Sequence, residues 1–219
     1  MTHAGMTEKP LSREAEQWRE AKELHGNHQL TLGPYFSHMV LKTPRRMLHL
    51  LSYYKFAAKI IGPGKRVLDV GCSEGFGTNL LAETAASCLG ADLDADAIAV
   101  ANQSVGSENL HFVAMDVLTT DPGRFDAVVT LDVIEHIFQD NEDAFVARMA
   151  RVLEPRGILV IGTPNITSDR YAGEHSRRGH VNLFSADRLR ELALRYFDNA
   201  FLFSANDEVV HTGFSPLAQ

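Results

Sequence analysis

Three ionisable residues interrupt an apolar segment of the chain, LDVIEHI, at residues 131–137. If this segment is a strand that ends near Leu131, then Asp132, Glu135 and His136 follow at i, i+3 and i+4 spacing and share one face of a helical turn. Charged groups are costly to bury unless they are hydrogen-bonded, paired or bound to a metal. We therefore expect this strand to end at the edge of a cleft.

Three roles suit this group of side chains. His136 beside a carboxylate can serve as a general base, since an imidazole titrates near neutral pH. Alternatively, Asp132, Glu135 and His136 can hold a divalent cation, which lowers the pKa of a bound hydroxyl nucleophile. In the third role, which is structural, Glu135 and His136 only shape the pocket and cap the turn. The sequence leaves all three open.

A glycine-rich turn follows the first strand-like segment, in RVLDVGCSEGFGTNLL at residues 66–81. Glycines allow a tight turn close to a ligand, and N–H groups at a helix start favour bound polar groups. The order Gly71-x-x-x-Gly75-x-Gly77 differs from the dinucleotide fingerprint, and the lysine of a phosphate-binding P-loop is absent. The turn also contains G-x-S-x-G, the nucleophile elbow of α/β-hydrolases, so an esterase using Ser73 stays an alternative. The several strands that normally precede that elbow are missing here.

Two further strand-like segments end in acidic residues. CLGAD ends at Asp92, 21 positions after Gly71, and VAMD ends at Asp116. In a parallel sheet the carboxyl ends of the strands meet at one edge, where a carboxylate can accept hydrogen bonds from both hydroxyls of a ribose. Each acid also has a simpler explanation, as part of a helix cap or a turn.

The glycine order, with Asp69 two residues ahead of Gly71, resembles the first motif of the class I S-adenosylmethionine-dependent methyltransferases. The resemblance extends over about residues 60–214. It implies S-adenosylmethionine as the cofactor and an α/β fold with a doubly wound, mostly parallel sheet of seven strands. It also implies that the cofactor contacts several strand ends, through Asp69, Gly71, Ser73, Gly75, Asp92, Leu93, Asp116, Val117 and Leu131.

The resemblance gives several of these residues a specific part. The acid at Asp69 is expected to help hold the amino-acid end of the cofactor, above the glycine turn. Asp92 is expected to bind the ribose, and Leu93 to pack on the adenine. Asp116 is expected to receive the adenine amino group, with Val117 beside the ring.

Two groups within this superfamily also carry an acid-x-x-Glu-His stretch. It is associated with magnesium or a related ion in ubiquinone-pathway O-methyltransferases and in small-RNA 2′-O-methyltransferases. Here Asp132 stands where a glutamate is expected, and its shorter reach disfavours such a site. The small-RNA enzymes use a further histidine downstream, which His175 or His180 could supply. We expect Glu135, His136 and His180 to be catalytic, and a metal on Asp132, Glu135 and His136 is the less favoured interpretation.

Apolar periodicity predicts the elements that position these residues. From Arg66 onward, short apolar runs alternate with helical patterns, as expected for a parallel sheet covered by helices on both faces. Near the end of the chain, FLFSA and EVVHTGF (201–205 and 208–214) are predicted to pair as antiparallel strands at the sheet edge.

The first 62 residues are predicted to form a helical extension that closes over a cofactor-binding domain at 63–219. The extension combines an exposed charged helix, an irregular segment at 31–42, and a helix that starts at Pro44 and is stopped by Gly62. Most of its aromatic residues are expected to pack in the core and some to line the acceptor pocket. These residues are Trp18, Tyr35, Phe36, Tyr53, Tyr54 and Phe56.

Composition excludes several classes of protein. The chain has 219 residues, of which 45% are hydrophobic, enough for one large domain. Two cysteines exclude a disulfide framework, and a formal net charge of −7 argues against a general affinity for nucleic acid. With neither a membrane-length apolar run nor a signal-peptide pattern, we expect a cytoplasmic enzyme. O-methylation of a small or sugar-containing molecule is the favoured activity, and a non-catalytic cofactor-binding module is the other alternative.

Overall fold

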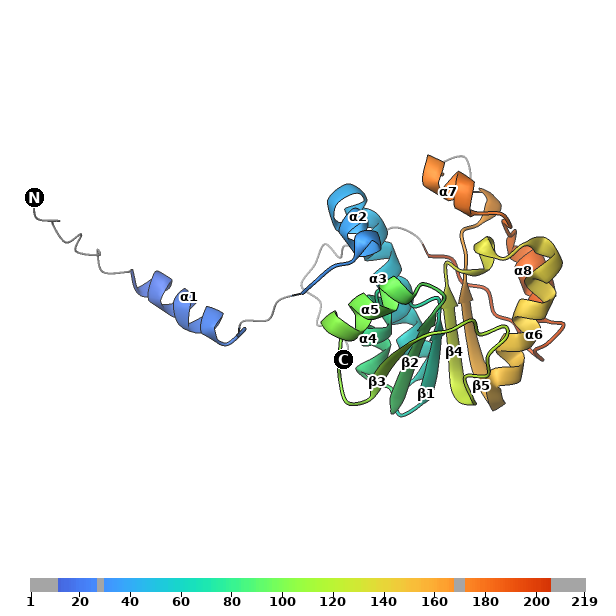
Figure 1. Ribbon diagram of the computed structural model, residues 1–219, viewed down its shortest axis with the longest axis horizontal. Coiled ribbons are helices and arrows are strands. Elements are labelled where there is room, and N and C mark those ends of the chain that lie inside the picture. The colour runs from blue at the N-terminus through green and yellow to red at the C-terminus, as the bar shows by residue number, and fades with distance from the viewer. Residues whose placement is uncertain (1–11, 27–29, 168–171, 206–219) are drawn as a thin grey trace, which may run out of the picture. The chain divides into compact units, whose positions relative to one another are not determined.

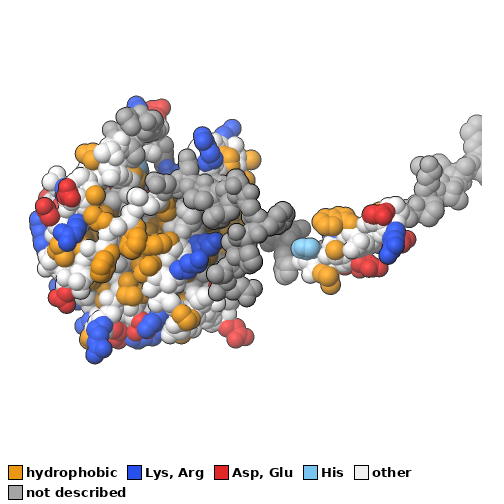
Figure 2. Space-filling model, turned by 180° about the vertical axis from the view of Figure 1, so that it is seen from behind, with side chains coloured by type: hydrophobic (Ala, Val, Ile, Leu, Met, Phe, Trp, Pro, Cys, Tyr) orange, Lys and Arg blue, Asp and Glu red, His pale blue; other side chains and the backbone are white. Residues whose placement is uncertain are grey.

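The computed structural model describes residues 12–26, 30–167 and 172–205 and divides into two compact units, Met1–Thr31 and Leu32–Gln219. The first unit contains α1 (Arg13–Glu23), whose first turn is capped by the Ser12 hydroxyl, which accepts a hydrogen bond from the Ala15 N–H at 3.2 Å. No residue of this helix is buried, and Trp18 is 68% exposed. Figure 2 shows acidic, basic and hydrophobic side chains together on its surface, as the sequence predicts for an exposed charged helix.

The second unit is built on a parallel sheet of five strands in the order β3-β2-β1-β4-β5 (Figure 1). The strands are β1 (Arg66–Val70), β2 (Ser87–Asp92), β3 (Leu110–Ala114), β4 (Phe125–Leu131) and β5 (Leu153–Gly162). The chain proceeds outward from β1 to β3 and then returns to place β4 on the other side of β1. At such a reversal in strand order, ligands bind at the carboxyl ends of the strands.

Helices cover both faces of this sheet, as the strand–helix alternation predicts. On one face lie α4 (Phe76–Ala82), α5 (Ala95–Ser104) and the two preceding helices, α2 (Pro34–Lys42) and α3 (Pro44–Ile61). On the other face lie α6 (Glu142–Val152) and α8 (Ala186–Ala193) (Figure 1). Three shorter helices, η1 (Ile134–His136), η2 (Gln139–Asn141) and α7 (Glu174–Gly179), belong to the connections after β4 and β5.

The core is divided by the sheet because successive side chains of a strand point to opposite faces. Val67 of β1 packs with α2, α3 and α4, whereas Leu68 and Val70 pack with α6 and α8. β1 and β4 lie at the centre of the sheet, so β4 is buried along its whole length except for Asp126. This rigid centre carries the loops that form the site.

The structure differs from two expectations about the fold and confirms a third. The described sheet has five strands rather than seven, because Phe201–Ala205 is not a strand and the predicted strand at 208–214 lies outside the described residues. The segment at 31–42 is wrongly predicted as irregular, since Pro34 starts the helix α2. The helix from Pro44 to Ile61 is confirmed, and Gly62 follows it with a φ of 76°.

The division of the chain at residue 62 stays a prediction, as does closure of the extension over the site. Both α2 and α3 pack into the same core as the sheet, and the boundary between the two units follows Thr31. In the described part of the chain, every helix is too short or too polar to span a lipid bilayer.

Candidate active site

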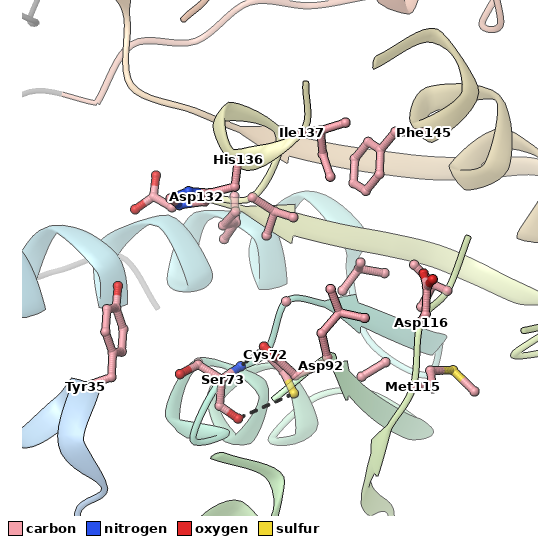
Figure 3. Close-up of a pocket in the computed structure, with 18 of the residues that line it drawn as sticks. Tyr35, Cys72, Ser73, Asp92, Met115, Asp116, Asp132, His136, Ile137 and Phe145 are labelled. Atoms are coloured by element: carbon pink, nitrogen blue, oxygen red, sulfur yellow. Dashed lines mark hydrogen bonds between the residues drawn. The ribbon is translucent and has the colours of Figure 1, made fainter. Parts of the chain in front are cut away.

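A cavity of about 360 Å³ opens at the carboxyl ends of the strands, between the glycine turn and the loop after β4 (Figure 3). Its size is within the range of small-molecule sites. Most of the sequence-predicted residues line it, namely Gly71, Ser73, Asp92, Leu93, Asp116, Val117, Leu131, Asp132 and His136. Asp69, Gly75, Glu135 and His180 do not line it.

The glycine turn, residues 71–75, requires backbone conformations that favour glycine. Gly71, Ser73 and Gly75 have φ values of 79°, 49° and 82°. A Cβ on Gly71 would lie 2.3 Å from Val133 Cγ2, in the loop after β4. The missing side chain at Gly71 therefore lets the loops after β1 and β4 approach each other at the cavity.

Asp92, at the end of β2, holds the glycine turn beside the cavity. Its Oδ2 accepts a hydrogen bond from the Ser73 N–H at 2.8 Å, and its Oδ1 accepts one from the Asp94 N–H at 2.9 Å. Each carboxylate oxygen keeps a second lone pair, and the side chain lines the cavity. The carboxylate can therefore accept further hydrogen bonds from a ligand diol. Leu93 beside it is 75% exposed and offers an apolar surface at the rim.

Asp69 is fully buried beneath the cavity rather than on its wall. Its Oδ2 accepts a hydrogen bond from the Thr78 hydroxyl at 2.6 Å, and its Oδ1 accepts one from the Tyr54 hydroxyl at 3.3 Å. Burial raises the pKa of Asp69 to about 7, although both hydrogen bonds act in the opposite direction. In this position Asp69 joins β1 to α3 and α4, and a direct contact with the cofactor stays a prediction.

Asp116 and Met115 lie at one end of the cavity, and Tyr35, Asp132 and His136 lie at the other (Figure 3). Asp116 also stabilises its own turn, since its Oδ1 accepts a hydrogen bond from the Leu118 N–H at 2.9 Å. Asp116 can both stabilise this turn and bind a ligand, because only its Oδ1 accepts the hydrogen bond from Leu118.

The loop after β4 begins with a left-handed residue, Asp132, at a φ of 54°. This conformation turns the chain away from the sheet into η1, so Glu135 and His136 do not continue the strand. Burial raises the pKa of Asp132, whereas the charges of Arg46 and His136 lower it. The prediction that the strand ends at a cleft lined by ionisable groups is confirmed for Asp132 and His136, whereas Glu135 does not line the cavity.

Glu135 is the buried member of this group. Its Oε2 accepts a hydrogen bond from the Thr163 hydroxyl at 3.0 Å, and its Oε1 has no hydrogen-bond partner among the described residues. Burial raises the pKa of Glu135 to about 7, and the charge of Asp132 adds to the effect. The backbone oxygen of Glu135 accepts hydrogen bonds from the N–H groups of Val181 and Asn182 at 2.8 and 3.1 Å, which brings the segment after α7 against η1.

His136 faces the cavity and is oriented by the same segment. Its Nδ1 lies 2.8 Å from the carbonyl oxygen of Gly179. A carbonyl only accepts, so Nδ1 carries the proton and the Nε2 of the neutral ring carries the lone pair. His180 packs edge-on against this ring, with the ring centroids 5.2 Å apart.

Glu135, His136 and His180 form the acid–histidine group. One ligand atom from each lies within 4.8 Å of the others, so this donor set could hold a divalent cation. His180, rather than Asp132, completes the group, and one oxygen of Glu135, Oε1, has no hydrogen-bond partner among the described residues. The side chain of His175, the alternative downstream histidine, lies outside the described residues.

The opposite wall of the cavity comes from α2 and α3, where Tyr35, Phe36, Leu50 and Tyr54 line it. Burial raises the pKa of Tyr35, and the nearby guanidinium of Arg46 lowers it. The aromatic content of this region signals an apolar wall, but the sequence does not distinguish the lining residues from the packing ones. Phe56, for example, contacts Phe203 at the surface instead.

Comparison with known proteins shows sequence similarity to methyltransferases. Residues 68–161 match a family described as "Methyltransferase domain". The chain is 31% identical over 117 residues to a "Probable S-adenosylmethionine-dependent methyltransferase" of Mycolicibacterium smegmatis, covering 53% of this chain and 44% of that one. It is 31% identical over 137 residues to the "Ubiquinone biosynthesis O-methyltransferase" of Xanthomonas campestris, covering 59% of this chain and 56% of that one. The chain thus spans about half the length of these curated relatives.

Solved structures agree with the fold. The N-methyltransferase NodS from Bradyrhizobium japonicum, in complex with S-adenosylhomocysteine, superimposes with a TM-score of 0.56 at 21% identity. The match covers 72% of this chain and 77% of that chain. At this identity the likeness concerns the fold alone.

Proposed function

We propose that this chain, which belongs to the class I S-adenosylmethionine-dependent methyltransferase superfamily, transfers a methyl group from S-adenosylmethionine to a hydroxyl oxygen of a small molecule. The observation that carries the proposal is the arrangement of one cavity. Its walls run from Asp116 past the glycine turn and Asp92 to His136, so that cofactor-type and base-type residues share one space. The name of the Xanthomonas campestris relative supports oxygen as the methylated atom.

The residues of the cavity fit the cofactor. The glycine turn offers a surface without side chains at Gly71, and Asp92 offers carboxylate oxygens for the ribose hydroxyls. Asp116 can receive the amino group of the adenine beside Val117. The amino-acid end then lies toward Asp132 and His136, which places the acceptor against Tyr35 and Phe36.

Methyl transfer requires the protein mainly to align the acceptor hydroxyl with the methyl group and to remove the hydroxyl proton. S-adenosylmethionine supplies a methyl group that its sulfonium has already activated. The Nε2 of His136 accepts the proton of the acceptor hydroxyl, and the Gly179 carbonyl stabilises the ring as it becomes positive. The apolar side chains of α2 and α3 exclude water, which would otherwise solvate the acceptor oxygen.

A divalent cation is the second way in which the acid–histidine group could act. Glu135, His136 and His180 would hold the ion, and it would lower the pKa of an acceptor hydroxyl. One carboxylate and two imidazoles suit zinc, iron or manganese better than magnesium. A base is sufficient for a phenolic hydroxyl, so we favour His136 as the base without a metal.

The test is a methyl-transfer assay with labelled S-adenosylmethionine and a panel of small phenols and sugar alcohols. We expect label in the ether product of at least one acceptor and loss of that product in the His136→Ala variant. Transfer only to amines or carboxylates, or cofactor binding with no transfer to any acceptor, would contradict the proposal of O-methylation. A Ser73→Ala variant is expected to keep the transfer, which separates this activity from that of an esterase.

A further inference from the structure

Glu74 lies inside the glycine turn but turns its side chain away from the cavity. It is 1% exposed, although it is a glutamate between two residues of the predicted cofactor loop. Its Oε1 accepts a hydrogen bond from the Tyr35 N–H at 2.8 Å, and its Oε2 accepts one from the Phe36 N–H at 3.0 Å. Both donors belong to the first turn of α2, nearly forty residues earlier in the chain.

The N-terminus of α2 depends on this carboxylate. Its N-cap is Gly33, which has no side chain to accept a hydrogen bond, and its first residue, Pro34, has no N–H. The Ser37 N–H is already bonded to the Gly33 oxygen at 3.0 Å. The N–H groups of Tyr35 and Phe36 are therefore the orphan donors of this helix end, and Glu74 satisfies both.

The packing shows that Gly33 and Glu74 are matched to each other. A Cβ on Gly33 would lie 2.3 Å from Glu74 Oε1, so a side chain at Gly33 and the carboxylate cannot occupy the same space. The negative charge also faces the positive end of the helix dipole. The N-terminus of α2 is therefore capped by a residue of the glycine turn and not by a residue adjacent to the helix.

Residues on both sides of this contact line the cavity. Ser73, adjacent to Glu74, lines the cavity and donates its N–H to Asp92, while Tyr35 and Phe36 line the opposite wall. A ligand that orders the glycine turn therefore acts on the residue that holds the start of α2. No other carboxylate among the described residues makes this connection.

We propose that Glu74 is a positioning residue that couples occupation of the glycine turn to the placement of Tyr35 and Phe36 on the acceptor side. The inference rests on the proposed function, because it takes the cavity as the cofactor site. A cofactor bound on the glycine turn restrains Glu74, and Glu74 in turn stabilises the N-terminus of α2 through its two hydrogen bonds.

The test uses S-adenosylhomocysteine as the probe and two variants of the full chain. Glu74→Ala removes the cap and the connection together. Glu74→Ala with Gly33→Ser removes the connection but gives α2 a serine N-cap of its own, since the carboxylate no longer blocks that position. Glu83→Ala, an exposed glutamate at the end of α4, is the matched control.

Hydrogen–deuterium exchange of α2 amides, with and without the probe, is the readout. In the unmodified protein and in Glu83→Ala, we expect the probe to slow exchange at the start of α2 by about tenfold, the range of a helix cap. In the double variant, exchange without the probe should match that of the unmodified protein, and the probe should have no further effect there.

Two outcomes separate the inference from the proposed function. If the probe does not bind the unmodified protein, the cofactor assignment fails and this inference fails with it. If the probe binds but the double variant still shows probe-dependent slowing in α2, Glu74 only caps the helix, and the coupling is refuted while the cofactor assignment stands.

Discussion

Replacing Thr78 with valine removes one hydroxyl from the buried contact that holds β1, α3 and α4 together. Thr78 is fully buried and donates to the Asp69 carboxylate at 2.6 Å. A hydrogen bond to a charged group contributes about 1.5–3 kcal/mol, and one between neutral groups about 1 kcal/mol. The size of the loss should therefore depend on the charge of Asp69.

The pH sets that charge in a known direction. Burial raises the pKa of Asp69 from 3.8 to about 7, so between these pH values the folded protein holds a proton that the unfolded chain has lost. The contribution of Asp69 to the free energy of unfolding therefore falls as the pH rises through this window and is constant above it. At pH 5 the hydrogen bond of Thr78 is to a neutral carboxyl, and at pH 8 it is to a carboxylate.

We expect Thr78→Val to lower the free energy of unfolding by about 1 kcal/mol at pH 5 and by about 2 kcal/mol or more at pH 8. For a domain of this size the loss at pH 8 corresponds to a Tm roughly 4–8 °C lower. Thr130→Val is the control, because Thr130 is also fully buried but its hydroxyl has no partner among the described residues. Urea unfolding at the two pH values measures both variants.

The control should be neutral or stabilising at both pH values, since valine removes a buried hydroxyl that lacks a hydrogen bond. Equal losses for the two threonines would show that the hydrogen bond to Asp69 does not account for the loss at Thr78. A loss at Thr78 that does not grow between pH 5 and pH 8 would show that Asp69 is already charged at pH 5, contrary to the raised pKa.

Three further predictions concern the site. Gly71→Ala should abolish S-adenosylhomocysteine binding in calorimetry, because the new Cβ would lie 2.3 Å from Val133 and φ is 79°; unchanged affinity would show that the glycine turn can move aside. Glu135→Gln should remove a pH-dependent loss of stability. Burial raises the pKa of Glu135 from 4.5 to about 7, so the free energy of unfolding of the wild type falls as the pH rises through that window. In urea unfolding, the variant should therefore gain roughly 2–3 kcal/mol relative to wild type between pH 5 and pH 8. His136→Ala should reduce methyl transfer by about 10²–10⁴-fold and leave the affinity for S-adenosylhomocysteine unchanged. EDTA should leave wild-type transfer intact, and inhibition by EDTA would instead favour a metal on the acid–histidine group.

The sequence predicts correctly that residues at or just after the strand ends lie at the cavity. Asp92, Asp116 and Asp132 reach the cavity because each lies at a strand end or within two residues of one, and parallel strands end at one edge. The glycine spacing predicts the turn for the same local reason. His180 could be connected to Glu135 and His136 only through the resemblance to known enzymes, because 44 residues separate it from His136.

Contacts between distant segments explain what the sequence did not reveal. Asp69 follows the family pattern, yet it is covered by Tyr54 and Thr78, and which of its neighbours it meets depends on how α3 packs. Glu74 reads as a polar loop residue, and its role appears only when α2 lies beside the turn. The one sequence signal for it is the Gly-Pro start of α2, a helix start without a capping side chain.

Binding of the cofactor product tests the central claim most directly. Calorimetric titration of the protein with S-adenosylhomocysteine should give one saturable site, and Asp92→Ala should weaken it by at least about tenfold, because a carboxylate that accepts ligand hydroxyls is lost. Asp96→Ala, an exposed acid in the first turn of α5, should bind as the unmodified protein does. A folded protein that shows no binding, or an Asp92→Ala variant that binds normally, would contradict the assignment of the cavity as an S-adenosylmethionine site.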